Sequence, residues 1–212
     1  MTTDIDLKTH WEDVYGSKAL EDVSWYQPTP ITSLEFIEGL GLDTDASIID
    51  IGGGDSYLVD HLLASGYSNI SVLDISKAAI DRAKKRLGDR AKLVQWIESD
   101  INDFTSAVKY DVWHDRAAFH FLTHNDDISR YVETVSRGLR PFGSLILGTF
   151  SENGPTKCSG IDITQYSQES MSSLFAETFV KIQCTNIDHP TPFKTTQNFT
   201  FCSFKRRNYF KS

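Results

Sequence analysis

No long hydrophobic run occurs in the sequence, and this absence argues against a membrane-spanning helix. The longest apolar stretches, residues 47–54 and 144–150, are far shorter than the roughly 20 residues that cross a bilayer. The N-terminus also lacks the basic segment and the apolar core of a secretory signal. We therefore expect a cytoplasmic protein with no membrane partner.

Cysteine is scarce, with Cys158, Cys184 and Cys202 as the three in the chain. They form no Cys-x-x-Cys pair, and an odd, sparse set without a secretion signal is typical of reduced thiols in the cytosol. No spacing of histidine, cysteine and carboxylate residues indicates a metal site. The sequence therefore predicts free thiols and no metal.

Basic residues are fewer than acidic ones. The chain has 21 Lys and Arg and 29 Asp and Glu, which gives a net charge of −8. This balance argues against a nucleic-acid-binding surface, because binding to the phosphate backbone requires clustered Lys and Arg. The basic cluster at 205–207 is explained by a solvated strand end. With 212 residues, of which 40% are hydrophobic, the chain suits a single domain over 1–212.

From residue 46 onward, short apolar runs alternate with segments of helical periodicity. Alternation of this kind predicts a three-layer α/β fold with a mostly parallel sheet. Two β-branched runs near the C-terminus have no helix between them, which indicates an antiparallel hairpin at the sheet edge. The expected strands are 47–51, 69–73, 92–97, 110–114, 144–150, 180–187 and 198–205, and the expected helices are 56–66, 77–87, 125–139 and 167–179.

Residues 1–28 lie outside this alternation and are rich in aromatic side chains. Trp11, Tyr15, Trp25 and Tyr26 occur in a segment for which we expect no strand or long helix. Exposed aromatic side chains in such number are costly unless they cover a surface. The segment is therefore predicted to be a lid, residues 1–28, over a catalytic core of residues 29–206. The first helix of the core is expected to begin with Thr29 as its N-cap and Pro30 as its first residue.

Glycine and acidic residues follow the predicted strands at the edge where open α/β sheets bind ligands. Gly52, Gly53 and Gly54 come directly after the first strand. Asp74 follows the second strand about 20 residues after the first glycine, the position of the acid that binds ribose hydroxyls. Asp100 follows the third strand. Together they predict a site for a nucleotide-type cofactor.

Three residues argue against a nicotinamide dinucleotide as that cofactor. Tyr57 stands where the dinucleotide fingerprint has its third glycine. Asp50 and Asp55 flank the glycine loop, and their carboxylates would repel a pyrophosphate but suit a ligand with an ammonium and a sulfonium group. An oxidoreductase that uses NAD is therefore disfavoured.

At these residues the sequence resembles the class I S-adenosylmethionine-dependent methyltransferases. The resemblance covers about residues 30–206 and rests on segments in family order: 50–54, Asp74, 99–101 and 110–113. The family loop is Gly-x-Gly, so Gly53 is expected to be a tolerated variant. The segments 10–15, 24–26, 113–122 and 157–160 are similar to a bacterial subgroup of small methyltransferases with unassigned substrates. The opening is also loosely similar to elongation-factor lysine methyltransferases.

This resemblance implies a Rossmann-like methyltransferase fold whose seven-stranded sheet has the order 3-2-1-4-5-7-6, with strand 7 antiparallel. It implies S-adenosylmethionine as the cofactor, S-adenosylhomocysteine as the product, and a set of cofactor contacts. Those contacts are Gly52, Gly53 and Gly54 under the methionine portion, Asp74 on the ribose, Ile75 on the adenine, Asp100 and Ile101 at the adenine amino group, Asp115 near the methionine end, and Trp11, Tyr15 and Trp25 from the lid.

A polar group after the fourth strand is the candidate for the acceptor side. If residues 117–122 begin a helix, Arg116 and His120 share one face. That face either lines an acceptor pocket, with His120 as a base or orienting group, or belongs to a structural network in which Asp115 pairs with Arg116. Cys158, in the loop after the fifth strand, either faces the acceptor or is an ordinary reduced cysteine.

The leading prediction is a methyltransferase that acts on a small molecule. One alternative is a protein lysine methyltransferase, which needs an open, acidic groove rather than a closed pocket. A second alternative is a binding module that keeps the cofactor fold without turnover.

Overall fold

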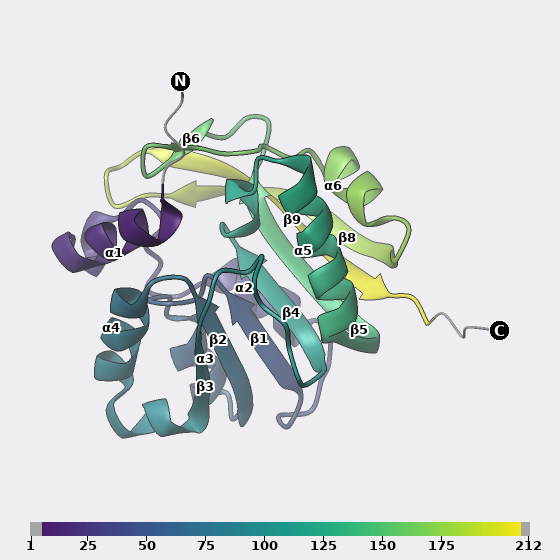
Figure 1. Cartoon of the computed structure of the whole chain (residues 1–212), viewed down its shortest axis with the longest axis horizontal. Coiled ribbons are helices and arrows are strands. Elements are labelled where there is room, and N and C mark those ends of the chain that lie inside the picture. The colour runs from purple at the N-terminus through teal and green to yellow at the C-terminus, as the bar shows by residue number, and fades with distance from the viewer. Residues whose placement is uncertain (1–5, 209–212) are drawn as a thin grey trace.

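The sheet has seven strands in the order β3-β2-β1-β4-β5-β9-β8 (Figure 1). The computed structural model describes residues 6–208. The last strand, β9, is antiparallel to both of its neighbours, while the other adjacent strands pair in parallel. Predicted strand order and direction are thus confirmed. The strands are β1 Ser47–Ile51, β2 Asn69–Asp74, β3 Val94–Glu98, β4 Tyr110–Arg116, β5 Leu139–Phe150, β8 Phe179–Pro190 and β9 Thr196–Arg206.

Helices cover both faces of this sheet and make two hydrophobic clusters. Helices α2 and α3 supply Phe36, Ile37 and Leu62 to one cluster. Tyr131 of α5 and Phe175 of α6 belong to the other. The helices are α1 Leu7–Ser17, α2 Ile31–Glu38, α3 Leu58–Ala64, α4 Lys77–Leu87, α5 Asn125–Gly138 and α6 Gln168–Phe175, with short 3-10 turns η1 Leu20–Asp22, η2 Gly88–Leu93 and η3 Phe119–Phe121, and a small hairpin of β6 Lys157–Cys158 and β7 Ile161–Asp162.

Local capping explains where α4 begins and ends. The Ser76 hydroxyl accepts a hydrogen bond from the Ala79 amide at 3.1 Å, which satisfies one of the free donors of the first turn. Gly88 ends the helix with φ of 58°, a conformation that glycine adopts without a steric penalty. Both signals were readable in the sequence.

Two expectations at the N-terminus are wrong. Residues 1–28 do contain a helix of 11 residues, α1, because Asp6 accepts hydrogen bonds from the Lys8 and Thr9 amides and so starts it. Thr29 is not an N-cap, since α2 begins at Ile31 with Pro30 before it in a non-helical conformation. The first five residues lie outside the described part of the chain.

The expectation of reduced thiols is also wrong for two of the three cysteines. Cys184 of β8 and Cys202 of β9 form a disulfide, with their Cα atoms 4.1 Å apart. They lie directly opposite one another in the antiparallel pair, where side chains on one face come close together. Cys158 is free and buried. The pairing depends on the register of the hairpin, which composition and spacing do not determine.

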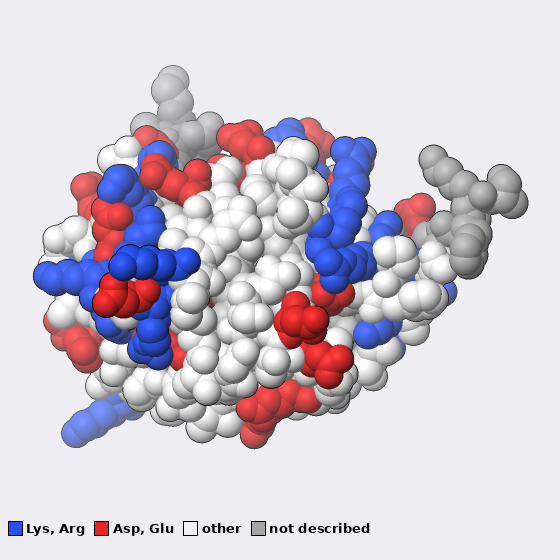
Figure 2. All heavy atoms as spheres, turned by 90° about the horizontal axis from the view of Figure 1, so that it is seen from below, with Lys and Arg blue, Asp and Glu red and all other residues white. Residues whose placement is uncertain are grey.

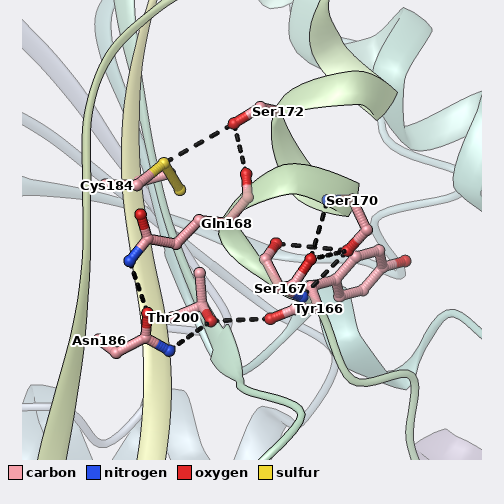
Figure 3. The surroundings of a disulfide bond; sticks show 9 residues. Tyr166, Ser167, Gln168, Ser170, Ser172, Cys184, Asn186 and Thr200 are labelled. Carbon is pink, nitrogen blue, oxygen red and sulfur yellow. Dashed lines mark hydrogen bonds between the residues drawn. A yellow bond between two sulfur atoms is a disulfide. The ribbon is translucent and has the colours of Figure 1, made fainter.

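A chain of polar contacts holds α6 beside this disulfide (Figure 3). The Ser172 hydroxyl of α6 lies 3.9 Å from the Cys184 sulfur. The Gln168 amide donates to Asn186 on β8 at 2.6 Å, and Asn186 donates to Thr200 on β9 at 3.2 Å. The hairpin and α6 therefore form one connected edge of the molecule.

The face at the amino ends of the parallel strands carries basic side chains on either side of a mostly uncharged strip (Figure 2). Exposed apolar side chains occur at the starts of three strands, namely Leu93 before β3, Val108 before β4 and Phe142 in β5. Within residues 6–208, no helix has the length and apolar character to cross a membrane.

We expect thiol titration of the denatured protein, purified without reductant, to find one free thiol per chain. Reduction should raise this count to three and lower the free energy of unfolding by about 3 kcal/mol, because the crosslink closes a loop of roughly 20 residues in the unfolded chain. Urea unfolding of the oxidised and reduced forms measures the difference.

The matched control is Cys158→Ser, which should leave no free thiol in the oxidised protein. Three free thiols in the unreduced wild type would contradict the disulfide.

Candidate active site

A cavity at the carboxyl edge of the sheet gathers most of the residues that the sequence singled out. Its walls come from the ends of β1, β2 and β4 and from the aromatic N-terminal segment. The predicted residues that line it are Trp11, Tyr15, Trp25, Gly52, Gly53, Asp74, Ile75, Asp100, Ile101 and Arg116. Gly54, Asp115 and His120 are not among the lining residues.

Close packing leaves no room for a side chain at the glycine loop. Gly52 has φ of 64°, and a Cβ atom there would lie 2.7 Å from the Ala118 Cβ. A Cβ on Gly54 would lie 2.5 Å from an Asp74 carboxylate oxygen. At Gly53 it would overlap the Asp50 carboxylate. Glycine at the middle position therefore fits this packing, in agreement with the expectation that it is tolerated there.

Asp74 is a buried carboxylate on the cavity wall. One oxygen accepts a hydrogen bond from the Gly54 amide at 2.9 Å and the other from the Ser76 amide at 2.8 Å. Burial raises the pKa of Asp74 to about 7, against the lowering effect of these two amides. A bound ligand that donates hydrogen bonds to the carboxylate would favour its ionised form.

Sequence reasoning missed a hydrogen-bonded chain from Asp50 through His114 to Ser33. Nδ1 of His114 lies 2.7 Å from Oδ1 of Asp50, and Nε2 lies 2.9 Å from the Ser33 hydroxyl. All three side chains are buried and line the cavity. The second carboxylate oxygen of Asp50 is buried without a hydrogen-bond partner among the described residues. The strand-end positions of Asp50 and His114 were a usable signal, whereas Ser33 comes from α2, far away in sequence.

Asp55 does not present a free charge to the cavity. Its carboxylate lies 2.9 Å from Arg82 Nε and 2.6 Å from Arg86 Nη1. Burial raises the pKa of Asp55, while the two arginines act in the opposite direction. Our expectation that Asp55 would repel a phosphate is therefore weakened, and Asp50 is left as the acid beside the loop without an arginine partner in an ion pair.

Asp115 points away from the cavity, because successive side chains of a strand point to opposite faces. Its carboxylate accepts hydrogen bonds from the amides of Ala118 and Phe119 at 3.0 and 3.1 Å, and from the Tyr131 hydroxyl at 2.7 Å. Burial raises its pKa to about 6. The alternative of an Asp115–Arg116 pair finds no support in these contacts.

His120 is buried and does not share a helix face with Arg116. β4 continues through Arg116, and only the short turn η3 follows it. Nδ1 of His120 accepts a hydrogen bond from the Phe150 amide at 3.4 Å. Burial, with a smaller contribution from the Arg116 charge, lowers its pKa to about 3. His120 is thus neutral at physiological pH.

The N-terminal aromatic side chains pack together over the cavity. The Trp11 ring contacts the rings of Trp25 and Phe121 edge-on, with centroids 5.6 and 5.2 Å apart. Helix α1 lies beside α4 (Figure 1), and polar contacts join the two helices. Glu12 accepts hydrogen bonds from the Lys77 and Ala78 amides at 2.5 and 3.1 Å, which places a negative charge at the N-terminus of α4.

Arginine 82 completes this attachment. Its Nη1 donates to the carbonyl oxygens of Tyr15 and Lys18 at 2.9 and 2.8 Å. These carbonyls lie at the end of α1, where backbone acceptors lack helical partners.

Comparison with known proteins agrees with this geometry. Residues 49–145 match the family model described as a methyltransferase domain. The resemblance to S-adenosylmethionine-dependent class I methyltransferases is confirmed. The EEF1A lysine methyltransferase 2 of Danio rerio is 23% identical over 93% of this chain and 81% of its own length. The malonyl-[acyl-carrier protein] O-methyltransferase 1 of Ilyobacter polytropus is 26% identical over 87% of this chain and 63% of its own length.

A solved structure shows the same fold at low sequence identity. The 1,6-didemethyltoxoflavin-N1-methyltransferase of Burkholderia thailandensis, crystallised with 1,6-didemethyltoxoflavin and S-adenosylhomocysteine, has a TM-score of 0.69 at 16% identity. The match covers 95% of this chain and 84% of that one. The methyltransferase fold therefore extends beyond residues 49–145.

We expect Gly54→Ala to lower the free energy of unfolding by about 1–3 kcal/mol, because its Cβ would press on Asp74 and on Ala79. Urea unfolding measures the loss. Gly16→Ala is the control, since no atom lies within 4 Å of its added Cβ and alanine favours the helix by about 0.5–1 kcal/mol. Equal stability of Gly54→Ala and wild type would contradict the packing argument.

Proposed function

We propose that this chain transfers the methyl group of S-adenosylmethionine to a small-molecule acceptor in the cavity. The observation that carries the proposal is the Asp50 carboxylate, which has one buried oxygen without a partner beside the glycine loop. A buried carboxylate oxygen of this kind is costly unless a donor reaches it. The ammonium group of the cofactor's methionine portion is such a donor.

The other walls of the cavity fit the remaining parts of the cofactor. Gly52 and Gly53 line the cavity and carry no side chain, which favours a close approach of the methionine portion to the backbone. Asp74 lines the cavity, which supports its predicted role as an acceptor of hydrogen bonds from ribose hydroxyls. Ile75 and Asp100 line both this cavity and a second one beside it, which suits the adenine. These roles, with those of Gly54, Ile101 and Asp115, stay predictions.

When bound, the methyl sulfonium supplies an already activated methyl group. The chain must then position the acceptor and exclude water. Trp11, Trp25 and Phe121 supply the apolar cover for this, and Trp25 can make a cation–π contact with the sulfonium. Among the predicted acceptor-side residues, Arg116 lines the cavity, whereas His120 does not and is a weak base because its pKa is about 3.

A small acceptor fits the charges of the cavity better than a lysine side chain. An acidic groove would favour lysine, but Asp55 is paired with two arginines, and Asp50 is hydrogen-bonded to His114 through one oxygen and binds the cofactor's ammonium group through the other in this proposal. The lysine methyltransferase alternative is supported by the Danio rerio relative. Incubation with radiolabelled S-adenosylmethionine, and separate counting of metabolite and protein fractions of a lysate, discriminates the two.

Label in metabolites supports the proposal, and label in proteins supports the lysine alternative. Binding of cofactor without label in either fraction supports the non-catalytic binding module. A cytoplasmic location stays a prediction, and the disulfide removes the support that the cysteine count gave it.

Cofactor affinity should depend on pH through Asp74. In the free protein its pKa is raised to about 7, and hydrogen bonds from ribose hydroxyls favour the carboxylate, so binding releases a proton. The affinity for S-adenosylhomocysteine should therefore weaken about tenfold from pH 8 to pH 6. Calorimetry across this range measures it. Asp74→Asn should bind weakly with a flat profile, and a wild-type affinity independent of pH would contradict the assignment.

We also propose that the lid, residues 1–28, orders on the cofactor while the chain remains a single domain. Hydrogen exchange in residues 8–28 should slow when S-adenosylhomocysteine binds, because lids come from the low-stability part of a structure. Interior strands should change little. Equal protection with and without ligand would show that the lid is a permanent part of the core.

A variant pair sharpens this test. Glu12→Gln weakens the attachment of α1 to α4 and should increase exchange in the free protein across residues 8–17. Asp13→Asn changes an exposed carboxylate on the same helix and should leave the exchange unchanged.

A further inference from the structure

Arg116 carries a charge that the described residues do not pair. It is the last residue of β4 and lines the cavity. Its Nη1 donates to the Trp25 carbonyl oxygen at 3.2 Å, and its guanidinium carbon lies 4.8 Å from the centre of the Phe199 ring. Its Nη2 is buried and has no hydrogen-bond partner among the described residues. A buried guanidinium with an unused donor is costly unless an acceptor reaches it.

The groups around Arg116 do not supply the missing negative charge. Burial raises the pKa of the Cys158 thiol to about 12, although the arginine acts to lower it. Burial and the same positive charge lower the pKa of His120 to about 3 and of His189 to about 4. These three groups, from β6, η3 and β8, are therefore neutral at pH 7.

Asp50 is the one carboxylate whose charge acts on Arg116, and the two side chains do not form an ion pair. Its Oδ1 is bound to His114, and no ion pair within residues 6–208 includes Arg116. Burial lowers the pKa of Arg116 to about 10, so the guanidinium remains charged at neutral pH. The partner must then come from a ligand.

Position favours the acceptor as that ligand. The predicted cofactor contacts that follow strand ends lie mostly at β1, β2 and β3, on one side of β4 in the sheet. Arg116 instead packs on the ring of Phe199 in β9, on the other side of β4. Aromatic side chains of Trp25, Tyr26 and Phe121 line the same cavity.

We propose that Arg116 binds a carboxylate of the methyl acceptor, so that the acceptor is a small organic acid. This rests on the proposed function, because it takes the cavity to hold cofactor and acceptor together. Arginine suits the role, since its planar guanidinium offers paired donors to a carboxylate. An apolar wall with one charged anchor is a common arrangement in small-molecule sites.

Calorimetry with matched acids and amides tests the proposal. The wild type, saturated with S-adenosylhomocysteine, is titrated with acetate, benzoate, phenylacetate and indole-3-acetate, and with the amide of each. At least one acid should bind roughly tenfold more tightly than its amide, as expected for a charge-assisted hydrogen bond. No preference for the acid anywhere in the panel would overturn the proposal without any variant.

Substitutions at Arg116 then test whether this residue causes the preference for the acid over its amide. Arg116→Gln should abolish it and Arg116→Lys should keep part of it, while the affinity for S-adenosylhomocysteine stays within about twofold. Arg130→Gln removes an exposed arginine of α5 and should leave the preference intact. Thermal melting checks the folding of each variant, and if Arg116→Gln does not fold, the wild-type panel and Arg116→Lys decide.

A different source of the anion has its own signature. If Arg116→Gln weakens S-adenosylhomocysteine about tenfold and leaves the acid preference unchanged, the arginine holds the cofactor's carboxylate and the proposal is overturned. If the wild type does not bind S-adenosylhomocysteine, the proposed function fails. The panel titrated into the free protein still decides the role of Arg116.

Discussion

The parallel pairing of β1 with β4 is the constraint on which the site depends. It places Asp50 opposite His114 in the register, and their side chains meet on one face of the sheet. Because side chains alternate along a strand, Arg116 shares that face with His114 while Asp115 turns to the other. Strand β4 thus supplies Arg116 to the cavity and Asp115 to a buried hydrogen bond with Tyr131. A shift of β4 by one residue would exchange these two roles.

Two of the buried polar atoms that lack a hydrogen-bond partner among the described residues belong to charged side chains of the cavity and make no ion pair. The Asp50 oxygen beside the glycine loop lacks a donor, and the Arg116 nitrogen toward β9 lacks an acceptor. Each is costly in the free protein, and each fits a ligand group of opposite charge. By comparison, Asp55 has two arginines and Asp74 has two backbone amides. The contrast indicates where ligands, rather than the protein, complete the network.

The β8–β9 hairpin connects the N-terminal aromatic segment to the sheet. Nε2 of His189 on β8 donates to the Ser24 carbonyl oxygen at 2.9 Å, and its Nδ1 accepts from the Gln27 side chain at 3.2 Å. The disulfide between Cys184 and Cys202 crosslinks the same hairpin. The N-terminal segment is therefore held at two places, by α4 at one end and by this hairpin at the other.

Local features of the sequence were enough to predict the strands, the glycine loop and the acids at the strand ends, whereas the order of the strands followed from the family resemblance. These depend on short-range patterns, since a buried strand, a glycine turn and a helix cap each involve a few consecutive residues. The length of α1 was missed because one capping residue, Asp6, started it. Trp11, Tyr15 and Trp25 line the cavity, which agrees with the prediction that the aromatic side chains of the N-terminal segment cover a surface.

Tertiary structure decided the contacts between residues far apart in the chain. Ser33 meets His114 only because α2 packs on the sheet, and Cys184 meets Cys202 only through the register of the hairpin. The open donor of Arg116 is likewise invisible in the sequence, because an unsatisfied group is defined by every neighbour around it. The sequence by itself determined which residues end the strands. The packing of distant segments determined which of those residues face the cavity and which remain without a partner.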